Sequence, residues 1–182
     1  MINYMTMKRV LLFGICLLFA MSACEDKDKL VYRPSKFPDA KEKRDMSFAI
    51  PYMDKNGAMV VRARLNSGPQ FSCIWDSGCS VPLKISALEA AQLIKDGTLS
   101  SRDYITSYPV TVANGQSNEY DVYLLKSVSF ADNKGNEHTL TDVPAVIDDN
   151  VGTDILIGLP VMQSLGYAHE ISQLENLIIF KE

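Results

Sequence analysis

The sequence of 182 residues predicts a mainly β protein, a compact and mostly antiparallel barrel or sandwich. Short apolar stretches recur from residue 46 onward, as expected for strands. Turn signals separate several of them, at residues 56–57, 114–115 and 133–135, and each contains Asn followed closely by Gly. Two short segments alone have a helical pattern. A composition with 47% hydrophobic and 22% charged residues is that of an ordinary folded domain.

The first residues have the pattern of an export signal. Lys8 and Arg9 precede an apolar run over residues 10–21, which is shorter than the about 20 apolar residues that span a bilayer. This pattern predicts a secretory signal peptide over residues 1–23. The segment Met-Ser-Ala-Cys that ends at Cys24 resembles the lipobox of bacterial lipoproteins, which implies that Cys24 is lipidated. An ordinary signal peptide followed by an unrelated cysteine is the alternative.

The residues that follow Cys24 predict a flexible tether over residues 24–44, because they are charged, contain Pro34 and Pro38, and have no apolar period. Removal of the signal leaves 16 basic and 22 acidic residues, a net charge of −6. This acidic balance argues against nucleic acid as a partner. We therefore expect a protein of the bacterial cell envelope, periplasmic or surface-facing, that is held to the membrane by acyl chains.

The elements of the domain, predicted over residues 45–182, follow in order. Strands are expected at residues 46–53, 58–65, 71–75, 110–113, 120–130, 138–147, 155–157 and 177–180. Ser86 and Glu89 form a capping box that opens a helix with an apolar face at Leu88, Ala91 and Leu93, and Gly97 ends it. A second short helix is expected at residues 160–165, before Gly166.

Asp76 is the residue most suggestive of chemistry, because it directly follows an apolar strand. A carboxylate there is costly to bury unless it is paired or protonated. Ser77 can supply a hydroxyl partner, and Gly78 allows a sharp turn. The triplet Asp-Ser-Gly is a weak signal by itself, since most such triplets are surface turns.

The order of the surrounding motifs makes the signal more specific. From about residue 46 to 180 the sequence resembles the retropepsin-like aspartic proteases, in particular their bacterial single-domain branch. The matching pieces are the loop at residues 74–80, the helical segment at 87–99, the Val-Ala-Asn-Gly segment at 112–115, and the apolar run with glycine at 155–162. Two departures are Cys79, where the family commonly has alanine, and Pro160 in the second helix, which a first turn tolerates.

The resemblance implies a retropepsin-like closed barrel with an active-site loop, a flap hairpin and two short helices. It also implies an aspartic endopeptidase with Asp76, Ser77 and Gly78 in the catalytic loop, and with Ala113, Asn114 and Gly115 in a flap over the peptide. No cofactor or metal is implied. The reaction needs two carboxyl groups that share one proton, and an acidic pH optimum follows.

A second catalytic carboxylate is missing from the sequence. Asp96-Gly97 ends a helix, and Asp148-Asp149 lacks the glycine. We therefore expect a homodimer that places Asp76 opposite its own copy. The rival function is a peptide-binding envelope lipoprotein of the same fold with little or no hydrolytic activity, and a purely structural β domain is a third reading.

Several side chains leave two readings open. Cys73 and Cys79 form either a disulfide or two free thiols. Four tyrosines either line a peptide groove or are ordinary half-buried strand residues, namely Tyr104, Tyr108, Tyr120 and Tyr123. Trp75 is expected in the core, on the side of its strand opposite to Asp76. His138 and His169 are expected to be solvated.

Overall fold

The computed structural model describes residues 47–111, 115, 117–166 and 168–181, and these residues are mostly in strands. The strands are β1 (Phe48–Lys55), β2 (Ala58–Leu65), β3 (Gln70–Trp75), β4 (Leu83–Ser86), β5 (Tyr104–Thr111), β6 (Ser117–Ala131), β7 (Glu137–Asp148), β8 (Ile155–Ile157), β9 (Ala168–Ser172) and β10 (Leu177–Lys181). The helices are α2 (Ala87–Lys95), the 3₁₀ helix η2 (Ser101–Asp103) and α3 (Leu159–Leu165). The predicted mainly β class is confirmed.

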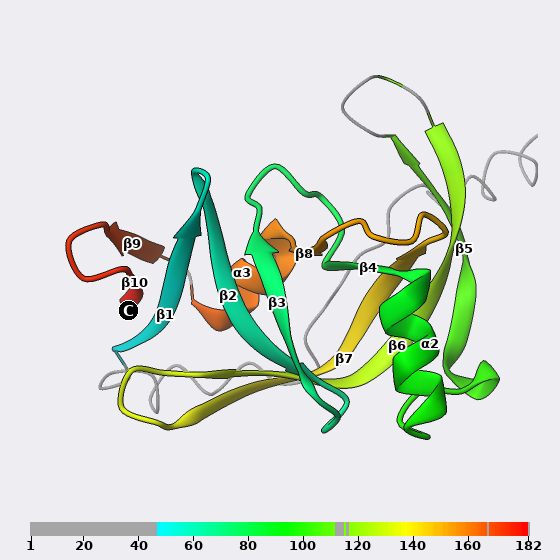
Figure 1. The fold of residues 1–182 in the computed structure, drawn as a ribbon, viewed down its shortest axis with the longest axis horizontal. Coiled ribbons are helices and arrows are strands. Elements are labelled where there is room, and N and C mark those ends of the chain that lie inside the picture. The colour runs from blue at the N-terminus through cyan, green and yellow to red at the C-terminus, as the bar shows by residue number, and fades with distance from the viewer. Residues whose placement is uncertain (1–46, 112–114, 116, 167, 182) are drawn as a thin grey trace, which may run out of the picture. The chain divides into compact units, whose positions relative to one another are not determined.

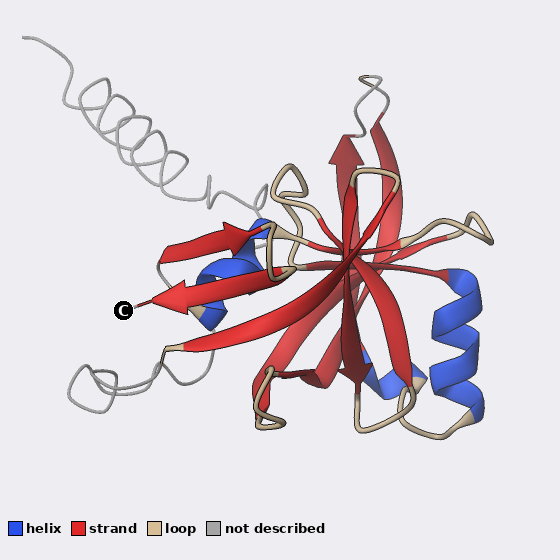
Figure 2. Ribbon diagram, turned by 60° about the vertical axis from the view of Figure 1, so that its left-hand side comes forward, coloured by secondary structure: helices blue, strands red, loops and turns tan. Residues whose placement is uncertain are grey.

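The described strands form one sheet in the order β5-β6-β7-β4-β8-β3-β2-β1-β10-β9. A further pairing, of β2 with β6, closes the six strands from β6 to β2 into a barrel (Figure 1). Most pairings are antiparallel, but β3 with β8 and β4 with β7 are parallel. The expected barrel with two short α-helices is thus present, and Figure 2 shows α2 on the outside of the strands.

Tight turns fix the registers of the hairpins. Between β1 and β2, Asn56 and Gly57 both have positive φ, 56° and 83°, as the favoured two-residue hairpin turn requires. The Gly57 amide also donates to Asp54 Oδ1 over 2.9 Å. At the tip of the β6–β7 hairpin, the Asn133 amide donates to the carbonyl oxygen of Ala49 over 2.9 Å, so this long hairpin also contacts β1.

Helix α2 has the predicted capping box but not the predicted apolar face. The Leu88 amide donates to the Ser86 hydroxyl oxygen, and the Ser86 amide donates to Glu89 Oε2. Ala90 and Leu93 are buried, whereas Leu88 is 60% exposed and Ala91 is exposed. The predicted face was wrong at Leu88 and Ala91 because this helix lies outside the barrel and buries a narrow stripe through Ala90 and Leu93, so that the residues beside this stripe face solvent.

The barrel core includes the side chain of Trp75, which is 4% exposed as expected. Its ring meets the rings of Phe130 and Phe180 edge-on, with centroids 6.2 and 6.0 Å apart. Such T-shaped contacts are a preferred geometry of aromatic pairs. Successive strand residues point to opposite faces, so burial of Trp75 leaves Asp76 on the other side of the chain.

Some elements differ from the expectations. Strands β4 and β9 were not predicted, and β5 begins at Tyr104 rather than at residue 110. His138 is not solvated: its side chain is 15% exposed, its Nε2 lies 3.1 Å from Asp132 Oδ2, and its ring stacks on Phe48. The side chain of His169 lies outside the described residues.

No helix in the described part of the chain is long and apolar enough to cross a membrane. In the same residues no group of three or more His, Cys, Asp or Glu side chains could hold a metal ion. The predicted signal peptide, Cys24 and the tether lie outside the described residues.

Candidate active site

Asp76 follows β3 at the point where this strand lies between β2 and β8. Its amide donates to the carbonyl oxygen of Ile157 over 3.0 Å, which extends the parallel pairing of β3 with β8 by one residue. The side chain is half-buried. Strand β8 therefore holds the backbone of Asp76, while its side chain stays partly accessible.

The loop after Asp76 turns back on this carboxylate. The Gly78 amide donates to Asp76 Oδ1 over 2.9 Å, and the Cys79 amide donates to the Asp76 carbonyl oxygen over 3.1 Å. A β-carbon at Gly78 would lie 3.2 Å from Asp76 Oδ1, so a larger residue would crowd the carboxylate. The Ser77 side chain is exposed, and among the described residues the expected hydroxyl bond from Ser77 to Asp76 is absent.

The junction of β8 and α3 supports the loop from behind. The Gly158 amide donates to the Pro82 carbonyl oxygen over 3.0 Å, and the Leu159 amide donates to the Cys79 carbonyl oxygen over 2.9 Å. Pro160 lies in the first turn of α3, where a missing amide hydrogen costs little. The helix thus tolerates the proline that departs from the family pattern.

A cavity of about 260 Å³ opens beside Asp76. Its walls come from the Asp76 loop, β4, β5, β6, β7 and β8, and the lining residues are Asp76, Gly78, Cys79, Ser80, Val81, Lys84, Val110, Thr111, Tyr120, Val146, Asp148 and Leu156. Of the four tyrosines, Tyr120 lines this cavity, whereas Tyr104 packs edge-on against Tyr123. The peptide-groove reading therefore fits Tyr120.

The predicted flap falls partly on the described residues. Gly115 has φ of 83° at the turn between β5 and β6, while Ala113 and Asn114 lie outside the described residues. Val110 and Thr111, the last residues before that turn, reach the cavity beside Asp76. The β5–β6 hairpin thus contributes one wall of the candidate site.

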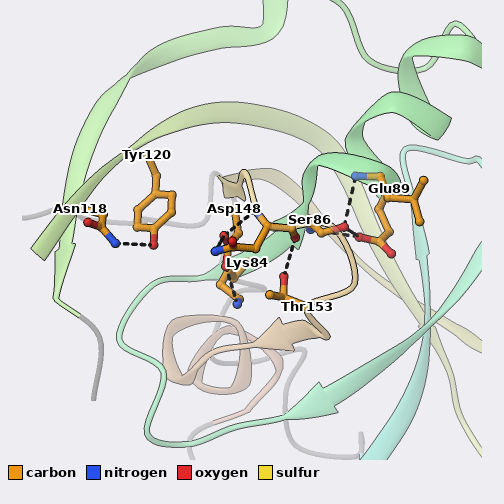
Figure 3. Close-up of polar contacts among 9 residues, drawn as sticks. Lys84, Ser86, Glu89, Asn118, Tyr120, Asp148 and Thr153 are labelled. Carbon is orange, nitrogen blue, oxygen red and sulfur yellow. Dashed lines mark hydrogen bonds and ion pairs between the residues drawn. The ribbon is translucent and has the colours of Figure 1, made fainter. Parts of the chain in front are cut away.

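A second carboxylate in the cavity, Asp148 at the end of β7, is engaged by other groups. Lys84 Nζ lies 3.0 Å from Asp148 Oδ2, an ion pair drawn in Figure 3. The backbone amide and Nδ2 of Asn150 both donate to Asp148 Oδ1 over 3.0 Å. Burial raises the pKa of Asp148, but the bonds from Asn150 and Lys84 outweigh it, so the pKa lies below its ordinary value. Asp148 is therefore held as an ionised carboxylate.

Cys73 and Cys79 are both free thiols, which decides between the two readings of this pair. Cys73 lies in the core, and burial raises its pKa to about 12. Cys79 lines the cavity, and burial together with the nearby charge of Asp76 raises its pKa despite a hydrogen bond to the Val81 carbonyl oxygen. Neither thiol has the lowered pKa of a nucleophile.

Comparison with known proteins supports the fold. The structure is similar to the crystal structure of a retropepsin-like aspartic protease from Rickettsia conorii, with a TM-score of 0.52 and 16% sequence identity over 74% of this chain and 89% of that chain. No protein-family model matches the sequence, and no curated protein matches it. The chain therefore has a retropepsin-like fold.

Two cavity residues, Lys84 and Asp148, carry functional groups that the sequence did not assign to a substrate-binding role. Tyr120 was one of four equivalent candidates, and Asp148 was considered only as a second catalytic aspartate. Lys84 and Asp148 are 64 residues apart in sequence and meet because β4 pairs in parallel with β7, where Ser86 stands opposite Asp148. The motif Lys-x-Ser before a capped helix gives no sign of this pairing.

Proposed function

We propose that the chain is an aspartic endopeptidase that works as a homodimer, with Asp76 of each subunit in a shared catalytic pair. The observation that carries this proposal is the position of Asp76: half-buried on a supported loop, with its carboxylate in the wall of a cavity large enough for a side chain. The retropepsin-like fold supports the same reading.

In the proposed reaction the two carboxyl groups share one proton. The ionised carboxylate takes a proton from a water molecule, which attacks the peptide carbonyl carbon, while the protonated carboxyl donates to the carbonyl oxygen. The Gly78 amide, which binds Asp76 Oδ1, keeps this carboxylate in one orientation. The β5–β6 hairpin would pair with an extended peptide as an added strand.

The second carboxyl group must come from another subunit. Asp148 is the other acid in the cavity, but Lys84 and Asn150 hold it in the ionised state, so it is unsuited to carry the shared proton. A two-fold axis through the catalytic centre would supply a second Asp76. The dimer is thus a requirement of the proposed chemistry.

The proposed location is the bacterial cell envelope. Residues 1–23 would direct export, Cys24 would carry the lipid, and residues 24–44 would tether the domain to the membrane. Metabolic labelling of the chain with a radioactive fatty acid, compared with a Cys24→Ala variant, tests this part by itself.

Mutation of the aspartate tests the activity. The full chain is incubated with a diverse peptide library across pH, with and without an active-site inhibitor of aspartic proteases. Asp76→Asn and Asp76→Ala should lower cleavage at least about a hundredfold, because they remove the acid–base group. Asp96→Asn, at the exposed end of α2, is the matched control and should cleave as the wild type does.

Each outcome decides between functions. Undiminished cleavage by the Asp76 variants, or cleavage by a species that sediments as a monomer, would overturn the assignment. Binding of peptides without cleavage would favour the second candidate, a peptide-binding envelope lipoprotein. The observation that favours this rival is that, among the residues the structure describes, a single chain offers one suitable carboxylate in the cavity.

A further inference from the structure

The cavity beside Asp76 has an apolar part and a polar part. The apolar residues in its lining are Val81, Val110, Val146 and Leu156. The polar groups in the same lining include Lys84 and Asp148, whose ion pair is drawn in Figure 3 together with Tyr120. A ligand group that fills this space must therefore satisfy both kinds of surface.

Lys84 is a partly buried cation with donors to spare. Its side chain is 22% exposed, and one N–H of the ammonium is used by Asp148 Oδ2 at 3.0 Å. A lysine ammonium has three N–H donors and no acceptor. Lys84 can therefore donate to a ligand oxygen while it keeps its partner.

Asp148 fixes Lys84 but offers little to a ligand itself. Its side chain is 7% exposed, Oδ1 accepts two bonds from Asn150, and Oδ2 accepts from Lys84. Oδ2 keeps one acceptor site, but a ligand cation that used it would lie close to the Lys84 ammonium and be repelled. The polar part of the cavity thus favours acceptors over donors.

Tyr120 adds a donor from β6. Its hydroxyl oxygen accepts a hydrogen bond from Asn118 Nδ2 over 3.3 Å, as Figure 3 shows. Because the oxygen is used as the acceptor, the hydroxyl hydrogen is left to donate. Tyr120 and Lys84 belong to different strands of the same lining.

We propose that this cavity is a substrate subsite that selects glutamate or glutamine, with Lys84 as the residue that determines the preference. This inference rests on the proposed function of the site as a peptide-binding cleft. The two methylene groups of either side chain would pack on the valine and leucine walls, and the terminal oxygen would accept from Lys84 and Tyr120. An aliphatic side chain would instead cover the Lys84 ammonium without a new partner, and a desolvated donor without a partner is costly.

The test separates binding from cleavage. Four peptides that differ at one position, with glutamate, glutamine, norleucine or lysine, are bound to full-length Asp76→Asn protein, and binding is measured by fluorescence anisotropy. The position is chosen from the cleavage profile of the wild type, or by scanning each position if the wild type does not cleave. Glutamate and glutamine peptides should bind about tenfold more tightly than the norleucine peptide, since a hydrogen bond to a charged group gives that order of preference. The lysine peptide should bind most weakly.

Variants of Lys84 identify the residue responsible. Adding Lys84→Met should remove the preference and make norleucine the best side chain, whereas Lys84→Arg should retain the preference for an acceptor. Lys126→Met removes an exposed lysine of β6 that is outside the cavity lining and should change nothing. Circular dichroism confirms that each variant is folded, and Lys84→Arg decides the question if Lys84→Met is not.

The outcomes distinguish this inference from the proposed function. Equal binding of all four peptides, or an unchanged preference in Lys84→Met, would overturn the subsite; so would a lost preference in Lys84→Arg if Lys84→Met is unfolded. Selective binding of glutamate or glutamine by a protein whose wild type cleaves nothing would support the subsite and refute the protease. Cleavage of peptides without this selectivity would support the protease and refute the subsite.

Discussion

The carbonyl oxygen of Val81 occupies the position that a side chain on Gly158 would take. A β-carbon built on Gly158 would lie 1.8 Å from this oxygen and 2.8 Å from the carbonyl oxygen of Cys79. The backbone of Gly158, with φ of −91° and ψ of 171°, is open to any residue, so the need for glycine here is one of space. This close approach joins the Asp76 loop to the start of α3.

Gly158→Ala should therefore destabilise the protein by more than about 3 kcal/mol, because backbone atoms rather than flexible side chains must move. Gly57→Ala is the matched control: it meets no atom within 4 Å and has φ of 83°, so it should cost only about 1–2 kcal/mol of left-handed strain. Urea unfolding of both variants gives the two values. Equal losses would show that the close approach carries no special cost.

The capping box of α2 gives a second stability prediction. Ser86 is fully buried, and its hydroxyl oxygen accepts from the Leu88 amide over 3.2 Å. Ser86→Ala should lower the free energy of unfolding by about 1 kcal/mol, because that amide loses its partner. Ser100→Ala removes the same kind of cap from the exposed 3₁₀ helix η2 and should cost less. A larger loss at Ser100 would contradict this reasoning.

Local signals in the sequence were enough to predict much of the fold. The Asn56-Gly57 turn and the Ser86 capping box depend on a few neighbouring residues, and both occur as predicted. Strand β4 escaped prediction because its four residues run directly into the helix cap. Leu88 was placed on the buried face because periodicity shows that a face exists, while the tilt of a helix on the barrel decides which residues it covers.

The residues of the candidate site also include some that local sequence predicts and some that it does not. Asp76 could be singled out because strand, acid and glycine are consecutive, and the structure puts this acid in the wall of a cavity. The Lys84–Asp148 pair could not, since it depends on the parallel pairing of β4 with β7 across 64 residues. The burial of His138 also depends on a residue far away in the sequence. Its ring stacks on Phe48 and pairs with Asp132, whereas the local sequence predicted a solvated side chain.

Asp132, in the turn of the β6–β7 hairpin, should make the folded protein less stable in acid. The Asn136 side chain is the largest cause that lowers the pKa of Asp132; burial opposes it, and bonds from His138 and from the Asn136 and Lys134 amides add to the lowering. A carboxyl with a lowered folded-state pKa stabilises the protein above its unfolded-state pKa of about 4 and loses this contribution as pH falls further.

Replacement of Asp132 isolates this effect. The free energy of unfolding is measured in urea at several pH values from about 6 down to about 2. The wild type should lose stability steeply below about pH 4, and Asp132→Asn should have a flatter acid limb and lower stability at pH 6. Asp149→Asn, an exposed carboxyl in a turn, is the control and should follow the wild type. Parallel curves for Asp132→Asn and wild type would contradict the prediction.

Mixing of subunits tests whether two Asp76 residues act together. If the active species is a dimer with one Asp76 from each chain, a subunit with Asp76→Asn forms an inactive pair with a wild-type subunit. In an equal mixture, random pairing leaves roughly a quarter of the dimers with both carboxyl groups. Adding Asp76→Asn protein to a fixed amount of wild type should therefore lower the cleavage rate, provided that the wild type is already fully dimeric and that subunits exchange.

Asp96→Asn protein, added in the same amounts, should raise the rate, because its active-site loop is intact and its subunits form active pairs. A rate that does not change on addition of Asp76→Asn would mean that each chain carries its own complete catalytic centre. Such a result would require a second carboxyl group within the chain, and Asp148, held ionised by Lys84 and Asn150, is poorly suited to be that group.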